Sequence, residues 1–82
     1  MTAYKIIQNG QDEPSLREAQ KFVGGYVEGI NFPNGDYMLV NEEGKLTGLA
    51  PNLKATKLYS VLSDDVIVGP AILIKASARK AW

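Results

Sequence analysis

The chain has 82 residues, of which 45% are apolar and 22% charged, and its formal net charge is zero. A globule of this size buries only about 60% of its unfolded surface, so we expect residues 1–82 to form a single domain. Histidine and cysteine are both absent. Their absence excludes the usual zinc, haem and iron–sulfur ligands, a disulfide framework, and thiol or serine–histidine catalysis. It leaves only carboxylate and carbonyl groups as ligands for hard cations. Adjacent acids in a strand point to opposite faces, so we interpret the acids as solvated turn residues and expect a protein that is not an enzyme and uses no cofactor or metal.

The charges are unevenly distributed along the chain. Residues 1–74 hold six basic residues against nine acids, whereas Lys75, Arg79 and Lys80 fall within the last eight positions. We interpret residues 75–82 as a solvated basic C-terminal tail, with contact to nucleic acid or an acidic partner as the alternative. No apolar run approaches about 20 residues, and no signal peptide is recognisable, so no membrane association and a cytoplasmic location are expected.

The first third of the chain predicts a strand followed by a helix. Residues 3–8 are rich in β-branched and aromatic side chains and are followed by Asn9-Gly10, which is typical of a strand that ends in a turn. Acids and a proline then favour a helix over residues 14–23. Gly24 and Gly25 are expected to end it, because glycine enters the left-handed region without a Cβ penalty.

The middle of the chain predicts a hairpin. Residues 26–32 and 37–40 read as strands, and the Pro-Asn-Gly-Asp turn between them combines a preset φ with positions that tolerate positive φ. After a second tight turn, residues 45–49 are interpreted as a short extra strand or an extended loop.

The last third predicts a helix and a buried strand. Asn52 is a suitable N-cap for a helix over residues 52–62. Residues 66–74 are almost all apolar, as in a strand that is covered on both faces, but Gly69-Pro70 marks a bulge, a bend or an edge position within it.

This order, β-α-β-β-α-β, predicts an α+β domain. We expect a mostly antiparallel sheet with both helices on one face. The order is compatible with the ferredoxin-like split βαβ arrangement.

Three blocks of sequence resemble a small family of uncharacterised proteins found mainly in bacteriophages and related mobile elements. The blocks are LREAQKFVGGYVEGI, NEEGKLTGLAPNLKATKLY and DVIVGPAILI, and together they cover residues 16–74. The matching positions are Gly24, Gly25, Glu28, Asn41, Glu42, Gly44, Leu49, Asn52, Asp65 and Gly69. Ala50 departs from the pattern, which has a proline before Pro51, and the C-terminal KASARKAW lies outside the resemblance.

The resemblance implies a phage accessory protein that acts in the cytoplasm of the infected host, and it implies no reaction. We hypothesise that the chain binds a host protein and inhibits a host or defence protein, as a homo-oligomer such as a dimer. One alternative is sequestration of a small nucleotide-like ligand at a subunit interface. A second alternative is binding of single-stranded nucleic acid by the aromatic side chains, although the acidic body of the chain disfavours it.

The connection from Asn41 to Thr56 is the predicted binding site, because loops held between rigid elements often carry binding groups. The candidate binding residues are Asn41, Glu42, Glu43, Lys45, Asn52 and Thr56. The residues expected to be structural are Gly24, Gly25, Gly44, Gly69 and Pro70. The alternative interpretation is that this stretch builds only a turn and a helix cap.

Overall fold

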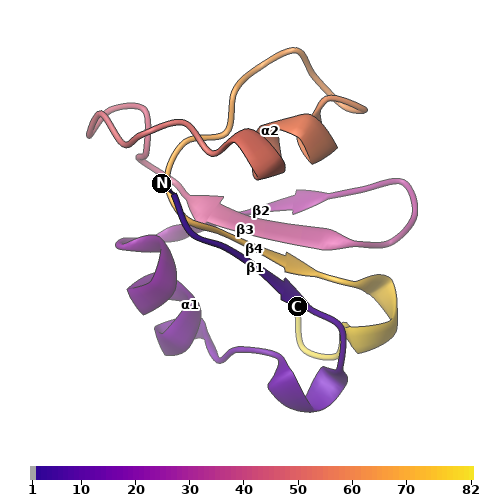
Figure 1. Cartoon of the computed structure of the whole chain (residues 1–82). Helices are drawn as coiled ribbons and strands as arrows, with labels where there is room; N and C mark the ends of the chain where they lie inside the picture. Colours follow the sequence, from indigo (N-terminus) through magenta and orange to yellow (C-terminus); the bar gives the residue numbers. More distant parts are fainter. Residues whose placement is uncertain (1) are drawn as a thin grey trace.

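A computed structural model describes residues 2–82 of the chain. Two helices and a four-stranded sheet follow one another in the predicted order, with a short 3-10 helix after β1 and another after β4 (Figure 1). The elements are β1 (Tyr4–Ile7), η1 (Gly10–Asp12), α1 (Leu16–Val23), β2 (Val27–Asn31), β3 (Tyr37–Asn41), α2 (Leu53–Tyr59), β4 (Ala71–Ile74) and η2 (Ala76–Ala78). The α+β class is therefore confirmed.

The sheet has the strand order β1-β4-β3-β2. β4 runs parallel to β1 and antiparallel to β3, and β3 is antiparallel to β2. Two of the three pairings are thus antiparallel, as predicted. The ferredoxin-like arrangement does not form, because β4 lies between β1 and β3 and separates them.

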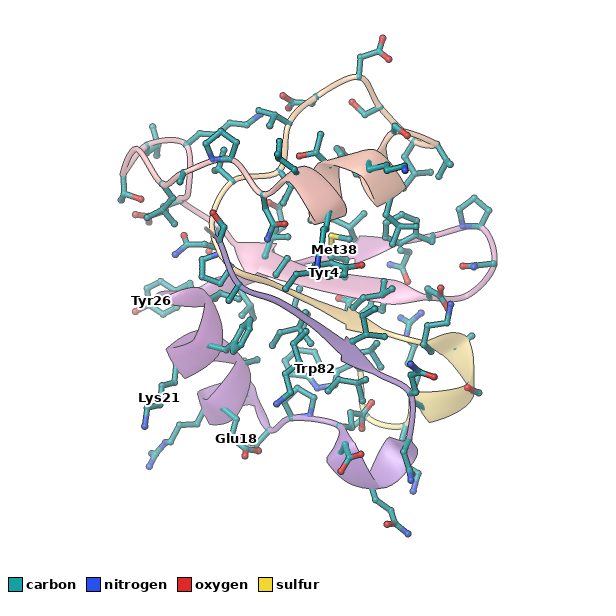
Figure 2. All side chains as sticks on the ribbon, viewed as in Figure 1. Tyr4, Glu18, Lys21, Tyr26, Met38 and Trp82 are labelled. Atoms are coloured by element: carbon teal, nitrogen blue, oxygen red, sulfur yellow. The ribbon has the colours of Figure 1, made fainter. Side chains whose placement is uncertain are left out.

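The two helices cover opposite faces of the sheet, so the expectation that both lie on one face is wrong (Figure 1). The α2 side buries Met38, Val40 and Leu73 together with Ala55 of α2. The α1 side buries a second cluster: Ile7, Ala19, Leu39, Ile72, Ile74 and Ala78. Figure 2 shows Met38 on the α2 side and Trp82 on the α1 side. Successive residues of a strand point to opposite faces, so the apolar run of β4 supplies side chains to both clusters.

Both helices begin at side-chain caps and are shorter than predicted. Ser15 caps α1, and its hydroxyl and the Glu18 carboxylate form a reciprocal capping box. Asn52 caps α2 as expected, and Gly24 ends α1 in the left-handed conformation at φ 84°. The capping box fixes the start of α1 after Pro14, because Ser15 satisfies the N–H of Glu18.

Neither residues 45–49, for which a strand or an extended loop was predicted, nor residues 66–70 form a strand. Residues 42–48 form consecutive turns, with hydrogen bonds such as Thr47 N to Glu43 O, and no strand forms over 45–49. The last strand begins only at Ala71, because Gly69 takes φ 83° and turns the chain before Pro70. Before that bend, Val68 makes only an isolated antiparallel bridge with Pro51.

The C-terminal residues are folded onto the α1 side, so the interpretation of a solvated tail is wrong. The Trp82 indole N–H donates to Pro14 O at 2.7 Å, and the backbone N–H groups of Lys80 and Ala81 donate to the Glu13 carboxylate. These backbone hydrogen bonds, led by that of Lys80, hold the pKa of Glu13 below its ordinary value. The indole therefore becomes part of the packing over the sheet.

Asp36 ties the hairpin turn to this C-terminal segment. The residue is only 4% exposed, and its carboxylate accepts hydrogen bonds from Lys75 Nζ at 2.9 Å and from Ala76 N at 2.8 Å. Asn34 Nδ2 donates a third, at 3.1 Å. Burial raises the pKa of Asp36, but these donors outweigh burial and leave that pKa below its usual 3.8.

Replacing Asp36 with asparagine is expected to lower the free energy of unfolding by about 1.5–3 kcal/mol, since hydrogen bonds to a charged group are lost. A carboxyl with a lowered pKa stabilises the fold above its unfolded pKa, and this contribution disappears as pH falls through the folded pKa. Urea denaturation between pH 7 and pH 2 should show a larger loss of stability below the ordinary value of 3.8 in the parent than in Asp36→Asn, which retains only the losses from Glu13 and Asp65 and other carboxyls. The exposed Asp64→Asn is the control. Equal stability of the two variants at pH 7 would contradict this role.

Candidate functional site

The outer edge of β2 is open. Two hydrogen bonds at the ends of the β2–β3 pair, from Glu42 N to Tyr26 O and from Phe32 N to Asp36 O, determine which residues of β2 bond to β3. Because inward and outward backbone groups alternate in an antiparallel pair, Glu28 and Ile30 bond to β3. The N–H and C=O groups of Val27, Gly29 and Asn31 consequently face outward. No partner for them occurs among residues 2–82.

Gly29 lies at the centre of this edge and is covered by an aromatic ring from the neighbouring strand. A Cβ atom at position 29 would lie 1.8 Å from the hydroxyl oxygen of Tyr37, so the ring occupies the space that a side chain would take. The Arg79 guanidinium stacks on the same ring at 4.2 Å from its centroid, and Arg79 Nη1 donates to Gly35 O. The backbone of the edge is thereby left without a side chain at its middle residue.

A groove lies beside this edge on the α2 face of the sheet. Its volume is about 250 Å³. The sheet contributes Glu28, Ile30, Val40 and Asn41, and the loop after β3 contributes residues 42 and 44–46. The opposite side is formed by Tyr59 and residues 65–68. We call this cavity the β2 groove. It combines an apolar floor with charged groups near its opening.

The charges of the β2 groove are mainly acidic. Lys45 is its only basic residue, and its ammonium group is paired with the Asp65 carboxylate. The hydrogen bond from Lys45 holds the pKa of Asp65 below its ordinary value. Glu28 and Glu42 are exposed, and neither makes a side-chain hydrogen bond or ion pair within residues 2–82. The unbalanced charge of the groove is therefore that of these two glutamates.

Four of the predicted binding residues lie in or beside the loop that borders the groove. Asn41, Glu42 and Lys45 line it, whereas Glu43 lines a separate hollow of about 450 Å³. The Asn41 side chain donates to Val23 O and accepts from Glu43 N, so it holds the loop against the end of α1. Gly44 lines the β2 groove, while Gly24, Gly25 and Pro70 line the other hollow.

Asn52 and Thr56 lie apart from the groove and bind the backbone. Asn52 is 2% exposed; its amide donates to Ala3 O at 3.1 Å and to Gly69 O at 3.0 Å, and its oxygen accepts from Ala55 N. The Thr56 hydroxyl accepts from Ile67 N at 2.9 Å. Both side chains fasten α2 to neighbouring segments.

Sequence reasoning missed several residues of the groove. Glu28 was among the positions of the resemblance but was not assigned to the site, and Ile30, Tyr59 and Val66 were not considered as lining. An acid on a predicted strand was the signal for Glu28. Ile30, Tyr59 and Val66 come together only through the strand order and the position of α2, and no local sequence pattern predicts either of these.

The fold and the groove define a small α+β domain with an open sheet edge beside an acidic groove. The chain belongs to a protein family described as a domain of unknown function (DUF3846), which matches residues 2–81. The match therefore extends over most of the C-terminal segment, which we expected to lie outside it. Neither a curated protein nor a solved structure matches the chain. Within residues 2–82 no helix has the length and apolar character needed to cross a membrane.

Asn52→Ala is expected to lower the free energy of unfolding by roughly 2–3 kcal/mol. About 1 kcal/mol comes from the lost cap, and the rest from the buried carbonyl of Gly69, which loses its donor. Asn52→Asp keeps the cap acceptor but places a carboxylate against two carbonyl oxygens, so it should be at least as unstable. Urea denaturation measures both against the exposed Glu43→Ala, for which we expect less than about 0.5 kcal/mol. An Asn52→Asp variant of parental stability would contradict the contacts of the amide.

Proposed function

We propose that this protein binds an extended segment of a partner protein by adding it as a fifth strand beside β2. The observation that carries the proposal is the row of outward backbone groups on Val27, Gly29 and Asn31. An unpaired strand edge offers main-chain hydrogen bonds to any extended segment, and adjacent pockets then select its side chains. The β2 groove supplies such a pocket on the α2 face.

The regular, uninterrupted course of β2 supports this mode of binding. Natural edges are often protected by proline, lysine or a bulge, and none of these interrupts the regular pairing of β2 with β3 from Val27 to Asn31. The edge is therefore suited to pairing over five residues.

The other two hypotheses receive less support from the same geometry. A nucleotide-like anion is disfavoured by Glu28 and Glu42, and Lys45 is already paired with Asp65. A stacking surface for nucleic acid needs several exposed rings. Phe32 is buried, while Tyr4 and Tyr59 pack against the α2-side core and Tyr37 and Trp82 against the α1-side core. Tyr26, at 70% exposure, extends away from the body of the domain (Figure 2).

The resemblance to phage proteins supplies the biological part of the proposal. The partner is a host protein met in the cytoplasm of an infected cell, and strand addition inhibits it by occupying a segment that it needs. The expected homo-oligomer would pair through β1, the strand at the other edge of the sheet, and this pairing would leave β2 open.

Asn31→Pro tests the proposal, because proline removes an outward N–H while the inward bonds of β2 are kept. Asn31→Ala is the matched control, since it removes the same side chain and retains the N–H. A displayed library of short random peptides is selected on the parent protein, and the recovered peptides are measured on both variants. We expect at least a tenfold loss of affinity in Asn31→Pro and parental affinity in Asn31→Ala.

Equal binding to both variants, with unchanged thermal unfolding, would show that the peptides do not use the β2 edge. An absence of recoverable peptides would also contradict the proposal. Circular dichroism of each variant verifies that the fold is intact.

A further inference from the structure

The side-chain chemistry of the β2 groove points to a particular class of partner segment, an inference that rests on the proposed function. We propose that the added strand carries a lysine or arginine whose side chain enters the β2 groove. Its charged end lies between Glu28 and Glu42, and its aliphatic stem lies on the apolar floor.

The positions of the two glutamates define where the positive charge of the partner segment binds. Glu28 is opposite Val40 in the ladder, and the bond from Glu42 N to Tyr26 O carries the pairing two residues further. Glu28 and Glu42 are thus diagonal neighbours, a relationship that places two residues about 7–8 Å apart. A single cation between them would relieve the repulsion of two like charges.

The floor of the groove explains why a long basic side chain fits better than a free metal ion. Ile30 and Val40 are more buried than the two acids, and Tyr59 lines the groove from the end of α2. Lysine and arginine side chains bury their methylene stems on apolar surface while the charged end stays near water. An aromatic ring adds a favourable interaction with a cation near its face.

The alternation of side chains along an added strand also determines which positions of the partner segment should be basic. Side chains of a strand alternate between the two faces of the sheet, so only every second residue of the partner faces the groove. The neighbouring residues face the α1 side, where Tyr37 covers Gly29 and carries Arg79 on its ring. A basic residue is favoured on the groove side and disfavoured beside Arg79.

The test uses the same displayed library and the full chain with a double substitution, Glu28→Lys with Glu42→Lys. Peptides whose binding depends on the β2 edge, as judged by Asn31→Pro, should be enriched in lysine or arginine at one position. Replacing that residue with alanine should weaken binding about tenfold. Selection on the protein that carries Glu28→Lys and Glu42→Lys should enrich aspartate or glutamate at that same peptide position. Glu43→Lys is the control, because Glu43 lies in the other hollow.

Four results would overturn the inference. If peptides that need the β2 edge show no preference for lysine or arginine, the proposed basic side chain is refuted and strand addition is unaffected. A basic preference that survives Glu28→Lys with Glu42→Lys, or one that disappears in Glu43→Lys, would place the recognition elsewhere. Peptides that bind Asn31→Pro as well as the parent would refute strand addition itself, and the inference with it.

Discussion

The structure depends on β4, which is paired on both sides and covered on both faces. Its four residues, Ala71–Ile74, are all buried between α1 and α2. A strand of this kind has to occupy an interior position, because every backbone group and side chain of it is withdrawn from water. β1 and β3 flank it, and the hairpin then leaves β2 at the outer edge. The open edge that we propose as a binding surface thus follows from burial elsewhere.

The sequence predicted local structure well because local chemistry determines it. Gly24 ends α1, Asn52 caps α2, and the Pro-Asn-Gly-Asp turn joins β2 to β3 in the expected places. The sheet face that each helix covers was not predictable in this way. An amphipathic pattern indicates that one side of a helix is buried, but it does not indicate which face of the sheet the helix packs on. The apolar run before Ile74 did predict burial on both faces, and that observation, taken further, requires a helix on each side.

The candidate site was only partly predictable for a related reason. Asn41, Glu42 and Lys45 were assigned from the character of a loop, and they do line the groove. Asn52 and Thr56 belong to the same stretch of sequence, yet their side chains turn inward and hold the backbone of neighbouring segments. Tyr59 and Val66 reach the groove from distant positions through tertiary packing. Residue type identified groups able to bind; the fold determined which of them face solvent together.

Amide hydrogen exchange of the dilute protein, followed residue by residue by NMR, tests the central claim most directly. The account predicts slow exchange for Glu28 and Ile30, which bond to β3, and fast exchange for Val27, Gly29 and Asn31, whose N–H groups face outward. An alternating pattern along β2 would establish that the edge is free to accept another strand. Uniform protection of all five amides would contradict the account, because it would mean that the edge is already paired.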